Sequence, residues 1–233
     1  MICQLQYLPH YKLTTPNITI HHNSPALRES PLNQRSDLIY NCAMRTYRAV
    51  NLNVLWFLIA LNVILFVITL IRPEETIYFL GLTPALLPQQ PWTIISSMFI
   101  HGSIWHILLN MISLYFLGNF FIRAVGEKSF LAVFFLGGLA GNILFVLLAN
   151  PFSTGIGASG AIFALGGALA VMIPRVPVFI FFIPVPIPLW VAIIIFFLFS
   201  FLPRIAWQAH LGGLLLGLVA GLIFRKRRRI YYF

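Results

Sequence analysis

Long apolar runs alternate with short polar breaks between residues 52 and 224. A helix that crosses the hydrocarbon core of a bilayer needs about 20 predominantly apolar residues. Prolines crowd residues 173–188, which makes the boundaries on either side of them the hardest to place. The pattern predicts an all-α polytopic membrane protein with a six-transmembrane-helix bundle. We expect the segments at about 52–71, 92–122, 129–149, 158–173, 189–202 and 206–224.

Composition supports the same class of protein. The chain is 60% hydrophobic and only 9% charged, with a mean hydropathy of +0.91. A soluble domain of this length carries far more charge. The net charge of +10 is typical of nucleic-acid binding in other contexts. Here the basic residues flank the apolar runs, which is the pattern of membrane topology, so we expect no nucleic-acid partner.

Three regions follow from the change in composition. Residues 1–50 are rich in Pro, Asn, Ser and Thr and are expected to be a poorly ordered cytoplasmic extension. Residues 51–224 form the membrane core, and 225–233 a basic cytoplasmic tail. Both Met1 and Met44 are possible starts. Cys3 and Cys42 precede the apolar part, and no metal-ligand spacing is present, so no metal is expected.

The distribution of basic residues predicts the orientation. With six spans both termini lie on one side, and the positive-inside rule makes that side cytoplasmic. Only Arg72 and Arg204 then lie outside. We therefore expect a plasma-membrane protein with both termini in the cytoplasm. The run Arg225–Arg229 is a topological anchor or a site for anionic lipid headgroups. The inside set is Lys12, Arg28, Arg35, Arg45, Arg48, Arg123, Lys128, Arg175 and Arg225–Arg229.

A few polar side chains interrupt the predicted spans at one depth. Polar groups inside a membrane are costly and usually face the interior of the bundle. Counted at 1.5 Å per residue, Ser159 and His210 each lie roughly 22 Å above the cytoplasmic basic residues, and Asn110 lies roughly 20 Å above them. That level is reachable by water only through a cavity open to the outer side. The set is His101, His106, Asn110, Asn142, Ser159 and His210.

Small residues predict that the fourth and sixth segments approach closely. Gly213, Gly217 and Gly221 follow His210 at i+3, i+7 and i+11, so they share its helix face. Ala164 and Ala168 continue a small-residue stripe beside Ser159. Small residues allow helix backbones to approach within a membrane, whether for packing alone or for catalysis.

A serine hydroxyl that meets an imidazole is the minimal activated nucleophile. No acidic residue follows Glu127, and the topology puts Glu127 on the wrong side for an orienting role. We therefore expect a Ser159–His210 dyad whose imidazole is held by packing. Free N–H groups at the start of the helix of Ser159 favour a developing oxyanion. His106 and Asn110 share a helix face and can add donors.

The ordered set resembles the rhomboid family of intramembrane serine proteases. The matching stretches are "HGSIWHILLNM" (101–111), "GASG" (157–160) and "AHLGGLLLG" (209–217), within a match over about 52–224. The loop at about 72–91 departs from the family because it lacks a common Trp-Arg pair. With six spans and no soluble domain evident, the chain resembles the basic prokaryotic form.

The resemblance implies roles for individual residues. Ser159 would be the nucleophile and His210 the general base. His106, Asn110 and the Ser159 backbone N–H would form the oxyanion hole. His101 would support a polar cavity, Gly157 would offer backbone near the scissile segment, and Phe163 would pack against the catalytic imidazole.

The implied function is cleavage of transmembrane or juxtamembrane segments of single-span membrane proteins, without a metal or organic cofactor. A non-catalytic membrane chaperone of the same fold is one alternative. A proton-coupled transporter is the other, although the chain shows neither the internal repeat nor the intramembrane acids that are frequent in transporters.

Overall fold

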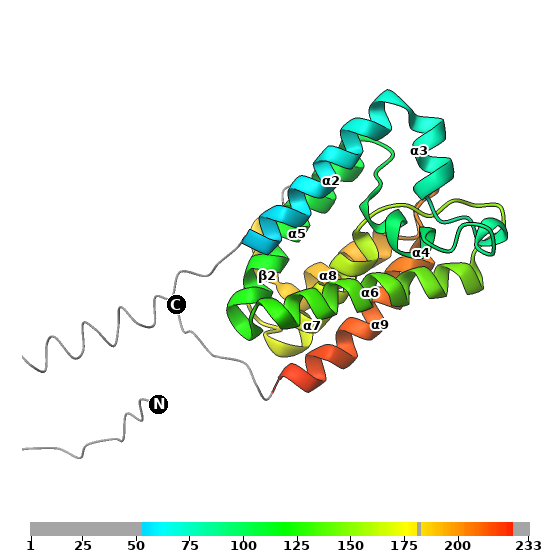
Figure 1. The fold of residues 1–233 in the computed structure, drawn as a ribbon. Coiled ribbons are helices and arrows are strands. Elements are labelled where there is room, and N and C mark those ends of the chain that lie inside the picture. The colour runs from blue at the N-terminus through cyan, green and yellow to red at the C-terminus, as the bar shows by residue number, and fades with distance from the viewer. Residues whose placement is uncertain (1–52, 181–182, 226–233) are drawn as a thin grey trace, which may run out of the picture. The chain divides into compact units, whose positions relative to one another are not determined.

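The computed structural model describes residues 53–180 and 183–225 (Figure 1). The expectations for the extension 1–50 and for the basic run beyond Arg225 lie outside these residues. The helices and strands, in chain order, are α2 (Asn53–Ile71), α3 (Pro73–Leu80), the 3-10 helix η1 (Pro84–Leu86), α4 (Thr93–Ser96), the 3-10 helix η2 (Ser97–Phe99), α5 (Ile104–Val125), α6 (Glu127–Leu148), α7 (Ser159–Met172), β1 (Pro177–Ile180), β2 (Ile183–Pro188), α8 (Leu189–Phe199) and α9 (Trp207–Phe224).

The predicted class of all-α polytopic membrane protein is confirmed. Within the described residues, α2, α5, α6 and α9 are long and apolar enough to cross a bilayer. Helices α7 and α8 are apolar but have 14 and 11 residues, about 21 Å and about 16 Å of helix. Both are shorter than a hydrocarbon core of about 30 Å. The number of six spans therefore stays a prediction.

The second predicted segment, 92–122, is wrong at its beginning. The chain from Thr93 to Phe99 forms α4 and η2 instead, and the spanning helix α5 begins only at Ile104. The reason is local. Ser103 has extended backbone angles, and its hydroxyl accepts the backbone N–H of His106 at 3.2 Å. This N-cap starts a new helix, whereas the apolar composition of the stretch had predicted a continuous one.

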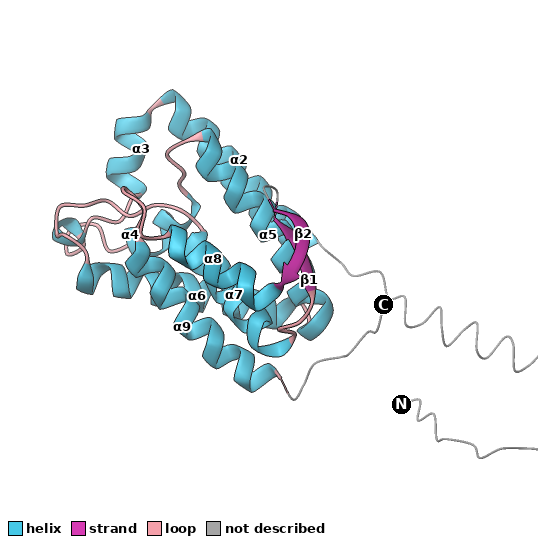
Figure 2. Ribbon diagram, turned by 180° about the vertical axis from the view of Figure 1, so that it is seen from behind, coloured by secondary structure: helices cyan, strands magenta, loops and turns pink. Residues whose placement is uncertain are grey.

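The Pro-rich segment between α7 and α8 forms two paired β-strands. Strands β1 and β2 pair antiparallel, with Pro177 opposite Pro188, and an irregularity interrupts the register after Val178 (Figure 2, magenta). Proline has no N–H to donate, so it is tolerated where an edge faces away from a partner. The fifth segment, predicted at 189–202, is shorter in the structure, because α8 ends at Phe199.

Helix α7 lies among the other helices and carries the most complete burial. It packs against α5, α6, α8 and α9 (Figure 1). Half of its residues are Gly or Ala, so neighbouring backbones come close on several sides. The buried residues of α7 are Gly160, Ala161, Ile162, Ala164, Leu165, Gly166, Gly167, Ala168, Leu169 and Met172.

The predicted approach of the fourth and sixth segments is confirmed by the α7–α9 contact. A Cβ on Gly213 would overlap the Gly160 carbonyl oxygen, and one on Gly217 would overlap that of Ala164. A Cβ on Gly221 would lie 2.7 Å from the Ala168 oxygen. Each of these three glycines of α9 thus faces a backbone carbonyl of α7, one helical turn after another. We call this contact the α7–α9 seam.

Gly217→Ala is expected to destabilise the protein, because the added methyl group meets backbone that cannot rotate away. Overpacking of this kind costs about 1–3 kcal/mol. The matched control is Val219→Ile, which adds one carbon to a side chain that is 58% exposed on the same helix. Thermal unfolding of both variants in one detergent measures the effect. Equal melting temperatures for the two variants would contradict the importance of the seam.

Candidate active site

Ser159 is the first residue of α7, and the loop before it is tied to the rest of the protein. Leu82 and Gly155 exchange backbone hydrogen bonds of 2.9 and 2.8 Å. The Gly157 N–H donates to the Ser97 carbonyl at 2.8 Å. Gly157 has a φ of 117°, in a region that L residues with a side chain rarely adopt. These bonds fix the turn that delivers Ser159 to the head of the helix.

The Ser159 and His210 side chains meet across the seam. His210 lies in the first turn of α9, and its Nε2 is 2.7 Å from Ser159 Oγ. His210 is 9% exposed. The Phe163 ring lies over it, with ring centroids 4.5 Å apart and planes inclined by 32°. Phe163 follows Ser159 by one helical turn, so a single helix presents both the hydroxyl and the ring to His210.

The imidazole also contacts a third side chain, which the sequence analysis did not identify. Ser200, at the end of α8, places its Oγ 2.7 Å from His210 Nδ1. The ring is thus held by this contact in addition to the packing that the sequence analysis expected. The only sequence signal was a lone serine at the end of an apolar run. Its distance of ten residues from His210 follows no helical spacing, because the chain reverses between α8 and α9.

His106 lies on the other side of Gly157. A Cβ built on Gly157 would lie 2.6 Å from His106 Nε2 and 3.8 Å from Ser159 Oγ. Because Gly157 has no side chain, a space remains beside it, and both the His106 imidazole and the Ser159 hydroxyl border that space. A polar atom of a ligand in that space would be close to both.

Asn110 is buried one turn further along α5. Its Nδ2 donates to the His106 carbonyl at 2.8 Å, a bond within the same helix. An amide nitrogen carries two hydrogens, so this bond uses one of its two donors. Within the part of the chain that the structure describes, the Asn110 side chain makes no hydrogen bond to another helix or to a loop.

His101 and Asn142 complete the polar set. His101 is fully buried, and its ring lies 4.9 Å from that of His106, edge towards face. Asn142 Nδ2 donates to the Ile94 carbonyl at 2.7 Å and to Ser97 Oγ at 3.0 Å. Asn142 thus ties α6 to the segment that accepts the Gly157 N–H. No three His, Cys, Asp or Glu side chains of the described residues gather to hold a metal ion.

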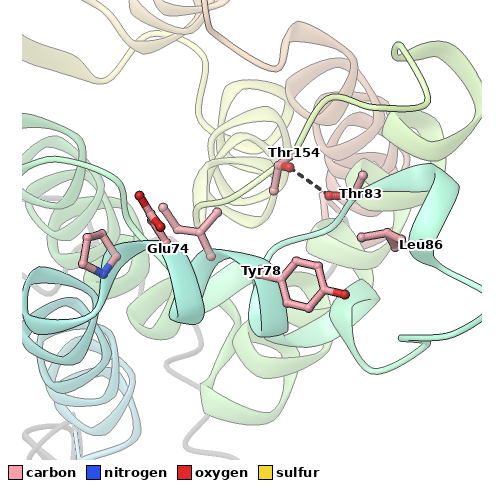
Figure 3. Close-up of a pocket in the computed structure, with 7 residues that line it drawn as sticks. Glu74, Tyr78, Thr83, Leu86 and Thr154 are labelled. Carbon is pink, nitrogen blue, oxygen red and sulfur yellow. Dashed lines mark hydrogen bonds between the residues drawn. The ribbon is translucent and has the colours of Figure 1, made fainter.

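A separate hollow of about 460 Å³ lies beside α3 (Figure 3). None of the predicted site residues lines it. Its rim includes the hydrogen bond of 2.8 Å between the Thr83 and Thr154 hydroxyls, drawn as a dashed line in Figure 3. The hollow therefore belongs to the junction between the α3 loop and the loop that leads to Gly157.

The arrangement around Ser159 can carry out nucleophilic chemistry. A serine hydroxyl 2.7 Å from an imidazole nitrogen can lose its proton to that nitrogen as its oxygen attacks an electrophile. Oxyanion stabilisation needs donors that point to the place where negative charge develops. The N–H groups of the first turn of α7 and the His106 imidazole are the candidate donors at this site.

Comparison with known proteins places these residues in a recognised domain. The family model described as Rhomboid domain matches residues 88–227. Rhomboid-like protease 3 of Toxoplasma gondii is 28% identical over 186 residues, which cover 75% of this chain and 70% of that protein. RHOMBOID-like protein 2 of Arabidopsis thaliana is 35% identical over 142 residues, covering 59% of this chain and 44% of that protein.

A mitochondrial relative matches a smaller share of its own length. Rhomboid protein 1, mitochondrial, of Saccharomyces cerevisiae is 29% identical over 153 residues, which cover 58% of this chain and 42% of that protein. The chain thus spans less than half the length of these yeast and Arabidopsis relatives.

Gly157→Ala is expected to lower the rate at which a fluorophosphonate labels Ser159, by about tenfold, because the methyl group displaces a candidate oxyanion donor. The matched control is Gly126→Ala. Gly126 also has a positive φ, 97°, but a Cβ there meets nothing within 4 Å. Both variants carry backbone strain, and only the first disturbs His106. Equal labelling rates for the two would contradict the placement of His106 at the site.

Proposed function

We propose a function on one premise: the chain belongs to the rhomboid family. The proposed activity is that of an intramembrane serine endopeptidase, which cleaves transmembrane or juxtamembrane segments of other membrane proteins. The observation that supports it most is the 2.7 Å contact between Ser159 Oγ and His210 Nε2 within the helical bundle. One of the relatives carries the name of a protease.

In the proposed reaction Ser159 Oγ attacks the carbonyl carbon of the scissile peptide bond. His210 Nε2 takes the hydroxyl proton and then gives it to the departing amine. This leaves an acyl group on Ser159. A water molecule, deprotonated by the same nitrogen, hydrolyses the ester and restores the hydroxyl. The cycle balances without a cofactor or a metal ion, and we propose none.

The negative charge of the tetrahedral intermediate needs donors. We assign this role to the Ser159 backbone N–H, the His106 side chain and the remaining N–H of the Asn110 amide. Gly157 supports the assignment, because its missing side chain leaves room next to His106. His101, buried against the ring of His106, is proposed to support the polar cavity.

The substrates that we propose are single-span membrane proteins. A helix protects its peptide carbonyls by hydrogen bonding, so the substrate has to unwind locally before Ser159 reaches a bond. Small or helix-breaking residues near the cut ease that unwinding. The lipid bilayer is the medium from which such a segment enters.

For the location, we propose the plasma membrane, with both termini in the cytoplasm and the active site open to the opposite side. The asymmetry of the basic residues supports this orientation. The yeast relative is named mitochondrial, which makes an internal membrane the competing location. We also propose that the basic run Arg225–Arg229 contacts anionic lipid headgroups.

Ser159→Ala and His210→Ala are each expected to abolish cleavage of a single-span substrate by the purified protein in liposomes. The double variant should lose no more than either single one, because the two residues act as a unit. A mass spectrum of the products locates the cut. Fluorophosphonate labelling should occur in the wild type and not in Ser159→Ala.

The control for these variants is Ser153→Ala, which removes the hydroxyl of a loop serine bonded to the Asn150 carbonyl. It should cleave at the wild-type rate. Cleavage by Ser159→Ala at that same rate would refute the proposed nucleophile. Wild-type protein that neither cleaves nor labels would favour the non-catalytic chaperone or the transporter.

Asn110→Ala is expected to lower turnover by about tenfold with little change in substrate binding, because one of several oxyanion donors is lost. The matched control is Asn62→Ala. The Asn62 amide makes the same bond to the carbonyl four residues earlier, at 2.7 Å, but in α2. Cleavage rate and thermal stability are measured on the same preparations. Reduced stability with unchanged turnover per folded molecule would rule out the oxyanion role of Asn110.

A further inference from the structure

We propose that Ser200 is a positioning residue, which holds the neutral His210 ring with its proton on Nδ1 so that Nε2 faces Ser159 as an acceptor. This inference rests on the proposed function, because it concerns the same general base. Ser200 Oγ lies 2.7 Å from His210 Nδ1, on the ring edge opposite to Ser159. Ser200 is only 1% exposed, so water does not compete for its hydroxyl.

We infer the direction of these hydrogen bonds from the Phe196 carbonyl, a group that can only accept. Ser200 Oγ also lies 3.4 Å from the Phe196 carbonyl oxygen, and a carbonyl has no proton to give. We assign the Ser200 proton to this carbonyl, which leaves an oxygen lone pair facing His210 at 2.7 Å. That lone pair accepts an N–H from Nδ1. A neutral imidazole has one N–H, so Nε2 is left as the acceptor for the Ser159 hydroxyl.

The end of α8 provides this hydroxyl through its own backbone geometry. The Ser200 N–H donates to the Phe197 carbonyl at 3.0 Å, three residues back, rather than continuing the i−4 pattern. The last turn is thereby tightened, and the hydroxyl reaches the Phe196 carbonyl. The carbonyl end of a helix carries partial negative charge, which favours the positive imidazolium that forms when His210 takes a proton.

A neutral serine suits a site inside a membrane. In soluble serine proteases a buried carboxylate performs this orienting task. A carboxylate in a low-dielectric interior is costly unless it is paired and fully hydrogen-bonded. A hydroxyl accepts the same N–H without a second charge. Among the described residues the acids are Glu74, Glu75 and Glu127, and none of them is hydrogen-bonded to His210.

Helix α8 also supports the face of the imidazole. The Phe197 ring contacts the Phe163 ring edge to face, with centroids 6.1 Å apart, and Phe163 lies over His210. Phe197 of α8 and Ser200, the residue that follows α8, thus both act on one imidazole: Ser200 at its edge and Phe197 through the ring on its face. The position of α8 therefore controls both the tautomer and the tilt of His210.

The test compares Ser200→Thr with Ser200→Val in the full-length protein in liposomes. The two side chains have the same shape and differ in the hydroxyl. We expect Ser200→Val to have a kcat about tenfold below that of Ser200→Thr with a similar KM, a smaller loss than the roughly ten-thousandfold effect of a wrong tautomer in a soluble triad. The rate of fluorophosphonate labelling of Ser159 should fall in parallel. Ser200→Ala should behave like Ser200→Val.

A second measurement does not depend on proteolysis. Nitrogen chemical shifts of His210, in protein labelled with 15N-histidine, report which ring nitrogen carries the proton. We expect the proton on Nδ1 in the wild type and in Ser200→Thr, and a mixture of tautomers in Ser200→Val. The control is Thr69→Val, which removes a buried hydroxyl bonded at 2.8 Å to the carbonyl four residues earlier in α2. It should change none of these readouts.

The outcomes separate the two proposals. Equal kcat and equal tautomer populations in the Thr and Val variants would overturn the role of Ser200, even if the wild type is an active protease. A wild type that neither cleaves nor labels, with the proton on Nδ1 only when residue 200 carries a hydroxyl, would refute the proposed function and support the positioning of the ring by Ser200.

Discussion

The close contact of α7 with α9 is the constraint on which the rest of the structure depends. Gly213 and Gly217 bring the two backbones together, because any side chain there would meet a carbonyl oxygen of α7. That separation lets a short side chain, the Ser159 hydroxyl, reach His210 directly at 2.7 Å. The same small residues make α7 an apolar rod that four other helices can surround. Packing and chemistry thus require one and the same spacing.

Around this seam, hydrogen bonds and one ring contact hold the polar side chains and the loop before α7 in place. The Gly157 N–H and the Asn142 amide both bond to the segment Ser97–Phe99 or its neighbour Ile94, which connects the loop before α7 with α6. Ser200 and Phe163 hold two sides of the His210 ring. Buried polar groups are costly unless they are paired, so each of these hydrogen bonds offsets the cost of keeping its two partners inside the bundle.

Sequence periodicity predicted the parts of this design that lie along single helices. The glycine spacing after His210 and the small residues after Ser159 place each stripe on one face, so the meeting of the two helices could be foreseen. Features that depend on how the chain reverses could not. Ser200 reaches His210 through the turn between α8 and α9, and no spacing rule covers that path. The break before Ile104 was hidden because an apolar stretch reads as helix, although Ser103 carried the capping signal. The pairing of β1 with β2 was not predicted, because prolines argue against a regular strand as well as against a helix.

The seam has a consequence for how the sequence of such a protein can diverge. Its active-site geometry is set by main-chain contacts and a few small or polar side chains, while the outer faces of α2, α5, α6 and α9 carry large side chains such as Phe57, Leu109 and Leu222, each more than half exposed. For those outer positions the surroundings demand only an apolar character. A lineage can therefore exchange most of its outer residues for others of similar polarity and keep the same reaction centre. Two members of such a lineage can share little sequence beyond a short set of glycines, alanines and polar residues, and still bring the same atoms together.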